Sequence, residues 1–197
     1  QNLVNIDLRV KEGIDHNDFN LLKRHNQGNL WNQIIILNLH GCQQLGQVAG
    51  NERVLNLRNL PSLTSLNLQG CNQLTEIDLR NCNVLPNLGL NLNILLRLNL
   101  NHCNALTNLN LQGCNKLENI NLQNCNALPN LNLNLDNLLS LNLNRCNALT
   151  NLDLQRCNQL AEINLQNCNA LLNLNLNLGN LLRLNLNHCT ALTNLDL

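Results

Sequence analysis

The chain has 197 residues, of which 44% are hydrophobic and only 1% aromatic, and its formal net charge at pH 7 is zero. A balanced charge argues against the strongly basic surface that holds nucleic-acid phosphates, so we expect no nucleic-acid partner. Asparagine interrupts the leucines throughout, and no run reaches the roughly 18 apolar residues that a membrane span needs. We therefore expect no membrane association.

The first 48 residues depart from the pattern of the rest. The stretch 11–25 carries two candidate helix caps and a short apolar face, which predicts a small helix. Residues 31–41 resemble a first, modified repeat, and the segment 46–53 predicts a loop. Because the terminal repeats of an array must cover an apolar end, we predict that residues 1–48 form a small helical N-terminal cap with a first irregular coil.

A short phrase recurs along residues 49–197. The unit C-N-x-L-x-x-[LI]-x-L-x-x begins at Cys103 and starts again eleven residues later at Cys114 and then at Cys125. One unit cannot bury its own leucines, whereas stacked copies can. Two units together give 21 or 22 residues, enough chain to turn once around a core. We predict an all-β-like solenoid with two short parallel strands in each coil, on opposite sides, with leucine inward and mostly asparagine outward.

The two predicted sides differ in their outward residues. One side is nearly a lattice of asparagines, whereas the other varies in residue type from coil to coil. Variation within a uniform array favours the second side as a surface that binds a partner. The alternative is that oppositely charged residues of adjacent coils form simple surface ion pairs, worth about 0–1 kcal/mol. The predicted partner-binding residues are Glu76, Asp78, Arg80, Arg97, Glu162 and Arg183.

All ten cysteines fall at one phase of the repeat, in slots that otherwise hold leucine. Such placement is typical of a small buried hydrophobe, so we expect free thiols and a reducing, cytoplasmic compartment. A zinc site needs four converging ligands, and nothing in the repeat converges. A cysteine–histidine nucleophile lacks a pocket for the same reason. We expect no metal, no cofactor and no enzymatic activity.

Residues 106–117 have the form L-x-x-L-x-L-x-x-C-x-x-L, which recurs at 74–85, 117–128, 149–160 and 160–171. This form resembles the cysteine-containing leucine-rich repeat, and the resemblance covers most of the chain. The family has its motif once per coil of 20–29 residues, whereas here it recurs every eleven, which looks like a nested bacterial subclass. The resemblance implies a bacterial effector or effector regulator, delivered into a host cytosol, and a rod straighter than the usual horseshoe.

The leading interpretation is a non-enzymatic protein–protein interaction module that binds, and in its stronger form inhibits, one protein partner. Two alternatives stay open: a structural or ice-binding solenoid, and the recognition half of a truncated ligase-type effector. Outward asparagine in place of repeated threonine argues against ice binding. The sequence stops within a unit, which predicts either truncation of a longer chain or end-to-end contact at an uncapped C-terminus.

Overall fold

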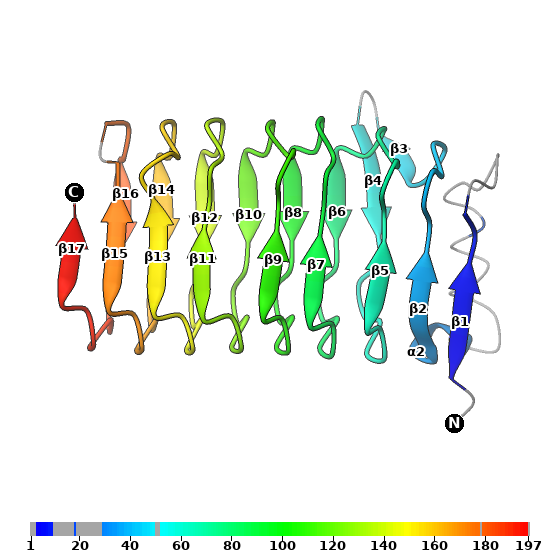
Figure 1. The fold of residues 1–197 in the computed structure, drawn as a ribbon, viewed down its shortest axis with the longest axis horizontal. Coiled ribbons are helices and arrows are strands. Elements are labelled where there is room, and N and C mark those ends of the chain that lie inside the picture. The colour runs from blue at the N-terminus through cyan, green and yellow to red at the C-terminus, as the bar shows by residue number, and fades with distance from the viewer. Residues whose placement is uncertain (1–2, 10–17, 19–28, 50–51, 178, 197) are drawn as a thin grey trace.

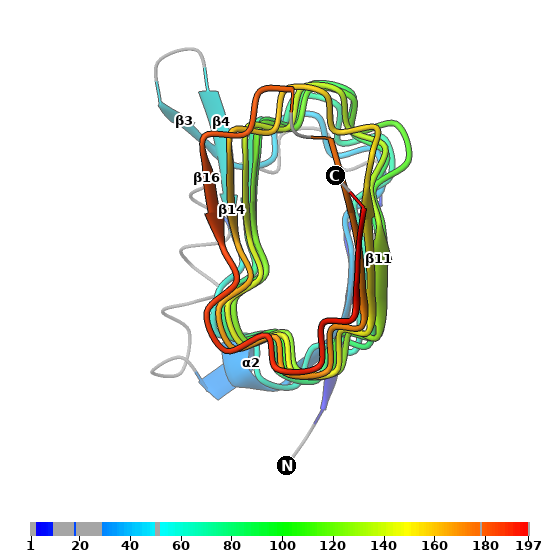
Figure 2. The ribbon, with the colours of Figure 1, turned by 90° about the vertical axis from the view of Figure 1, so that its left-hand side faces the viewer.

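In a computed structural model, which describes residues 3–9, 18, 29–49, 52–177 and 179–196, the chain winds into a rod of stacked coils (Figure 1). Seen along the rod, successive coils superpose around one interior, with strands on two opposite sides (Figure 2). Hydrogen-bonded neighbours in the stack lie 21 or 22 residues apart in sequence. The predicted β-solenoid, with coils of this length and two parallel strands per coil, is confirmed.

The N-terminal part begins with β1 (Val4–Asp7), which pairs in parallel with β2 (Ile34–Asn38). The short helix α2 (Asn29–Asn32) comes just before β2 and contains Trp31, which is buried and donates a hydrogen bond from Nε1 to the carbonyl oxygen of Arg58 at 3.3 Å. The strand β2 falls within the predicted modified repeat, whereas β1 was not predicted. Of the helix predicted at 11–25, the structure describes only Asp18, and the other residues lie outside the described part of the chain.

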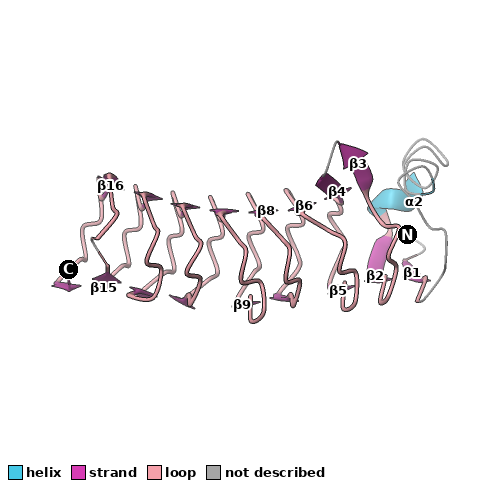
Figure 3. Cartoon of the chain, turned by 90° about the horizontal axis from the view of Figure 1, so that it is seen from above, coloured by secondary structure: helices cyan, strands magenta, loops and turns pink. Residues whose placement is uncertain are grey.

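The segment predicted as a loop at 46–53 contains strand structure instead. Strand β3 (Gln47–Ala49) runs antiparallel to β4 (Glu52–Asn56), and this hairpin stands out from the rod (Figure 3). Gly46 leads into it with φ of +94°, and a Cβ there would lie 2.8 Å from the carbonyl oxygen of Val54. The loop prediction was wrong because a hairpin supplies pairing that the eleven-residue period does not reveal.

One side of the rod, which we call the charged face, is a continuous eight-stranded sheet. From β4 onward every pairing in it is parallel. Parallel pairing without a shift places corresponding residues of successive coils in straight columns. After the hairpin, its strands are β6 (Glu76–Asp78), β8 (Arg97–Asn99), β10 (Asn119–Asn121), β12 (Ser140–Asn142), β14 (Glu162–Asn164) and β16 (Arg183–Asn185).

The opposite side, the asparagine face, is divided into three sheets, β1-β2-β5, β7-β9 and β11-β13-β15-β17. Pro86 precedes β7 and Pro129 precedes β11, so each break coincides with a proline, which has no N–H to donate. At the corresponding position of a later coil, Leu172 donates its N–H to the carbonyl oxygen of Thr150 at 2.9 Å, and pairing continues. The strands after β2 are β5 (Ser65–Asn67), β7 (Asn87–Gly89), β9 (Asn108–Asn110), β11 (Asn130–Asn132), β13 (Asn151–Leu154), β15 (Asn173–Leu176) and β17 (Asn194–Asp196).

The interior consists almost entirely of leucine, isoleucine and cysteine side chains that form one cluster along the rod. All ten cysteines are free, nine of them buried, as predicted. The thiols donate hydrogen bonds to the backbone of the preceding coil. Cys103 Sγ donates to the carbonyl oxygen of Leu79 at 3.2 Å, and Cys146 Sγ donates to the carbonyl oxygen of Leu122 at 3.1 Å. Cysteine therefore fills an apolar slot and also supplies a weak hydrogen bond to the preceding coil.

Asparagine is abundant partly because it ends the strands. The Oδ1 atom of Asn99 accepts a hydrogen bond from the backbone N–H of Asn101 at 3.1 Å, and Asn142 does the same for Asn144. This local bond, an Asx turn, favours the bend that follows. At the corner after each charged-face strand the chain then adopts positive φ, between 60° and 63°, at Asn59, Asn81, His102, Asn124, Arg145, Asn167 and His188.

Candidate interaction surface on the charged face

The first residues of the charged-face strands form a single outward column. Glu76 is the register partner of Arg97, and Glu162 is the register partner of Arg183. Asn119 and Ser140 lie in register between the two pairs. The structure therefore gathers four of the predicted residues, Glu76, Asp78, Arg80 and Arg97, at one end of the face. It places Glu162 and Arg183 toward the other end of the same column.

Glu76 and Arg97 form an ion pair across neighbouring coils. Arg97 Nε donates to Glu76 Oε2 at 2.8 Å, and both side chains are about one-third exposed, 34% for Arg97 and 31% for Glu76. A partly solvated pair of this kind stabilises the fold by about 0–1 kcal/mol. The pairing considered from the sequence is therefore present, and it leaves both groups accessible to a partner.

Asp78 and Arg80 interact within one turn. Arg80 donates to the Asp78 carboxylate through Nε at 2.9 Å and through Nη2 at 2.7 Å, and its backbone N–H donates at 3.2 Å. Burial disfavours the ionised form of Asp78, but the hydrogen bonds from Arg80 outweigh burial and hold the pKa of the carboxyl below its ordinary value. With an exposed fraction of 7%, Asp78 holds the turn and offers little surface for contact.

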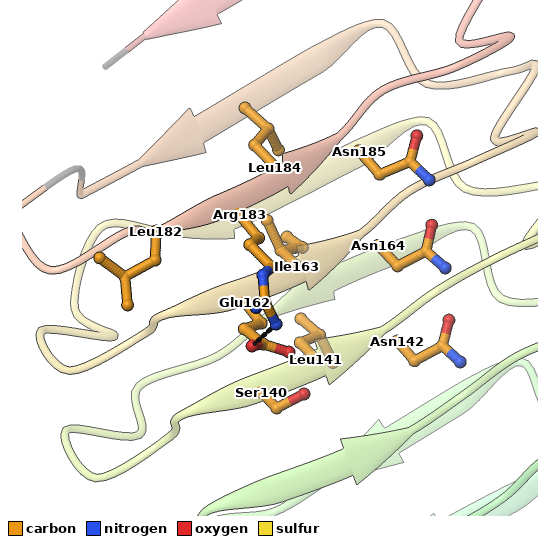
Figure 4. A pocket seen from close by; sticks show the side chains of 10 residues that line it. All are labelled: Ser140, Leu141, Asn142, Glu162, Ile163, Asn164, Leu182, Arg183, Leu184 and Asn185. Carbon is orange, nitrogen blue, oxygen red and sulfur yellow. Dashed lines mark hydrogen bonds and ion pairs between the residues drawn. The ribbon is translucent and has the colours of Figure 1, made fainter.

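Glu162 and Arg183 form the most exposed pair on this face, with Arg183 Nη1 2.5 Å from Glu162 Oε1 and side-chain exposures of 77% for Arg183 and 49% for Glu162. The pair lies in a hollow of about 590 Å³ (Figure 4). Leu182 lies on one side of the pair, and a column of asparagines, Asn142, Asn164 and Asn185, lies on the other.

A second hollow, of about 280 Å³, contains the Glu76–Arg97 pair. Ser140 and Asn142 line both hollows, so the depression runs along the charged face from Glu76 to Arg183. Such a row, with charges of both signs and uncharged polar groups between them, offers a partner several distinct contacts.

Two exposed leucines that directly precede residues of the charged column were not predicted from the sequence. Leu182 is 81% exposed and Leu139 is 40% exposed, each immediately before a residue of the charged column. The sequence signal that could have revealed them is a pair of consecutive leucines, at 138–139 and at 181–182. In each pair the first leucine is more buried than the second. These two leucines add apolar area to a row that is otherwise polar or charged.

The asparagine face uses its amides internally. Asn151 Nδ2 donates to Asn130 Oδ1 at 2.7 Å, Asn173 Nδ2 donates to Asn151 Oδ1, and Asn194 Nδ2 donates to Asn173 Oδ1 at 2.5 Å. The amides form a ladder along the rod, as stacked asparagines do in other parallel β-structures. Groups bonded in this way have less capacity left for a partner or for ordered water.

Within the described residues, no group of three or more His, Cys, Asp or Glu side chains is placed to hold a metal ion. The described part of the chain also contains no helix with the length and hydrophobicity needed to span a membrane. Comparisons with protein-family models, with curated proteins and with solved structures found no match in any of the three.

Proposed function

We propose that the protein is a non-enzymatic, leucine-rich-repeat type module that binds a protein partner through the charged face. The observation that carries this proposal is the hollowed row from Glu76 to Arg183, where exposed ion pairs stand beside the exposed leucine Leu182. Glu76, Arg97, Glu162 and Arg183 make the charged contacts, and Asp78 with Arg80 supports the turn beside them.

A rigid surface supports this role. The columns are held by parallel backbone pairing, and the charged side chains are already paired with one another. Docking then costs little additional conformational entropy. Charges of both signs select a partner with the complementary pattern and disfavour others.

Two finer parts of the proposal rest on the repeat motif. The L-x-x-L-x-L-x-x-C pattern, with its cysteine bonded to the preceding coil, supports assignment to the nested leucine-rich-repeat type. Free, buried thiols favour a reducing compartment such as a cytosol. By resemblance alone, we extend the proposal to a bacterial effector or effector regulator that acts on a host protein.

A charge exchange tests the use of this face. The variant E76R/R97E/E162R/R183E keeps both ion pairs but inverts the pattern that a partner meets. The control D7R/R9D exchanges an exposed pair at the end of β1, away from the charged face. A partner is first captured by the wild type, identified by mass spectrometry, and then titrated against all three proteins.

We expect the charge exchange to weaken binding by at least about tenfold, a free-energy change of about 1.4 kcal/mol. The thermal midpoint should stay close to that of the wild type because the intramolecular pairs remain. The D7R/R9D control should bind as the wild type does. Unchanged affinity of the fourfold variant would remove the charged face from the proposal.

A further inference from the structure

The outward column of the charged face is complementary in charge to its own reverse. From one end of the rod to the other, the first residues of β6, β8, β10, β12, β14 and β16 are Glu76, Arg97, Asn119, Ser140, Glu162 and Arg183. The charges therefore read negative, positive, two neutral positions, negative and positive. Read from the other end with every sign inverted, the order is the same. A second copy of the chain, laid on this face with its rod reversed, thus presents an opposite charge to each of the four charges.

A twofold axis produces this arrangement if it lies between the two faces, parallel to the strands and midway between β10 and β12. Such an axis reverses the order of the coils but keeps each residue's position along its strand. Glu76 then faces Arg183 of the second copy, and Arg97 faces Glu162 of the second copy. Each contact occurs twice, as in the isologous interfaces of homodimers. Because successive coils superpose along the rod (Figure 2), the two columns can stay in contact over all six strands.

The two neutral positions in the middle of the column select one alignment. If the second copy is shifted by one coil, Arg97 faces Arg183 or Glu76 faces Glu162, and these like charges repel. If it is shifted by two coils, no charge faces an opposite charge. A parallel arrangement places every charge opposite its own counterpart and is repulsive throughout. The pattern therefore favours one arrangement and also disfavours its neighbours, which is what specific pairing requires.

The third residues of the same strands are compatible with this alignment. The axis places Asn121 opposite Asn142, and Asn99 opposite Asn164, so uncharged amides face uncharged amides. Among the third residues of these six described strands, Asp78 alone is charged, and it is already bonded to Arg80 of its own chain. This second column therefore leaves no charge in the contact without a partner.

The charged side chains are accessible for such a contact. Glu76 and Arg97 are about one-third exposed, and Glu162 and Arg183 are 49% and 77% exposed. In the dimer each ion pair gains a second neighbour of opposite charge. Six coils spaced by about 4.8 Å, each with three strand residues of about 3.3 Å, present a flat area on the order of 300 Å². A standard interface buries roughly 800 Å² on each partner, so we expect a weak association that weakens further in salt.

We propose that the charged face binds a second copy of this chain, with the two rods reversed, to form a weak symmetric dimer. This inference rests on the proposed function, because it names the partner of the same face. The hairpin β3–β4, which stands out from the rod, lies beyond Glu76 and so outside the six matched strands (Figure 3). Any other protein that uses this face has to displace the second copy.

The two halves of the charge pattern can be exchanged separately, and each exchange keeps its intramolecular ion pair. E76R/R97E and E162R/R183E each turn all four contacts of their own dimer into contacts between like charges, whereas a mixture of the two restores every opposite charge. The fourfold variant E76R/R97E/E162R/R183E is again complementary to itself but repels the wild type. The control D7R/R9D leaves the charged face unchanged. Association is measured by sedimentation equilibrium, and in mixtures one chain carries a fluorescent label.

We expect the wild type, D7R/R9D and the fourfold variant to self-associate alike, and each more strongly at low salt than at high salt. Each twofold exchange alone should self-associate at least about tenfold more weakly. The mixture of the two should regain the affinity of the wild type, which also shows that both variants are folded. The fourfold variant should bind the wild type at least about tenfold more weakly than it binds itself.

A wild type that stays monomeric at low salt overturns this proposal. So do twofold exchanges that self-associate as the wild type does, or a mixture that regains no affinity. If the wild type is monomeric but the fourfold variant loses a different captured protein, the proposed function stands without the dimer. If the wild type is monomeric and the fourfold variant keeps that protein, both proposals fail.

Discussion

The buried thiols allow a quantitative test of the dry interior. Burial raises the pKa of Cys82, Cys103 and Cys168 from 9.0 to about 12 because a thiolate would lose its hydration there. At pH 8 a thiol with a pKa of 12 is ionised in about one molecule in 10,000, against about one in ten for a pKa of 9. Since the thiolate is the reactive form, we expect these thiols to react about 1,000-fold more slowly than free cysteine, before any steric exclusion.

Cys189 differs from the others because it is only partly buried, in the coil that contains β17. Treatment of the native protein with an aromatic disulfide reagent at pH 8 should modify Cys189 first. All ten cysteines should react quickly in guanidinium chloride. The variant Cys189→Ser should lose the fast phase, and mass spectrometry of the digested protein assigns each site. If several buried cysteines react as fast as Cys189 while the circular dichroism spectrum is unchanged, the thiols do not line a dry interior.

Two further predictions concern stability. Unfolded thiols ionise near pH 9 and the thiols of Cys82, Cys103 and Cys168 near pH 12, so the unfolded state loses protons first as pH rises. Below pH 9 these thiols are protonated in both states and the free energy of unfolding does not depend on them. Between pH 9 and 12 the free energy of unfolding falls by about 1.4 kcal/mol per pH unit for each thiol. Equal urea midpoints at pH 8 and pH 10 would contradict this. Arg145 has φ of +62°, so Arg145→Val should lower the free energy of unfolding by about 1–2 kcal/mol. Arg145→Asn introduces the residue type found at the equivalent corner position 124 and should leave the free energy of unfolding nearly unchanged. Equal urea midpoints for the two variants would show that the corner is not strained.

The residues assigned to each side of the rod were predicted from the repeat. The units beginning at Leu92 and Cys114 lead into β8 and β10 on one face, and those beginning at Cys103 and Cys125 lead into β9 and β11 on the other. This was possible because eleven residues cannot encircle a core and twenty-two can. The strands β1 and β3 were missed because they lie before the repeat or at its first residue, where the eleven-residue period gives no signal.

The candidate site was predicted less completely. The variable column was recognised from its residue types, and its use as a binding face remains a prediction. Asp78 looked equivalent to Glu76 in the sequence, but its carboxylate turns onto the backbone of Arg80. An aspartate can accept a hydrogen bond from the backbone two residues later, whereas the longer side chain of Glu76 reaches Arg97 of the next coil and stays more exposed.

The sequence by itself determined the period, the inward and outward residues, and the reduced state of cysteines that recur in a leucine slot. These follow from local periodicity, because a side chain's direction along an extended strand depends only on its position. The tertiary structure alone decided which carbonyl oxygen each thiol meets and that the asparagine face is interrupted between β9 and β11, where Pro129 precedes β11. Each of these depends on the residue one coil away, and that neighbour is defined only when the coils are stacked.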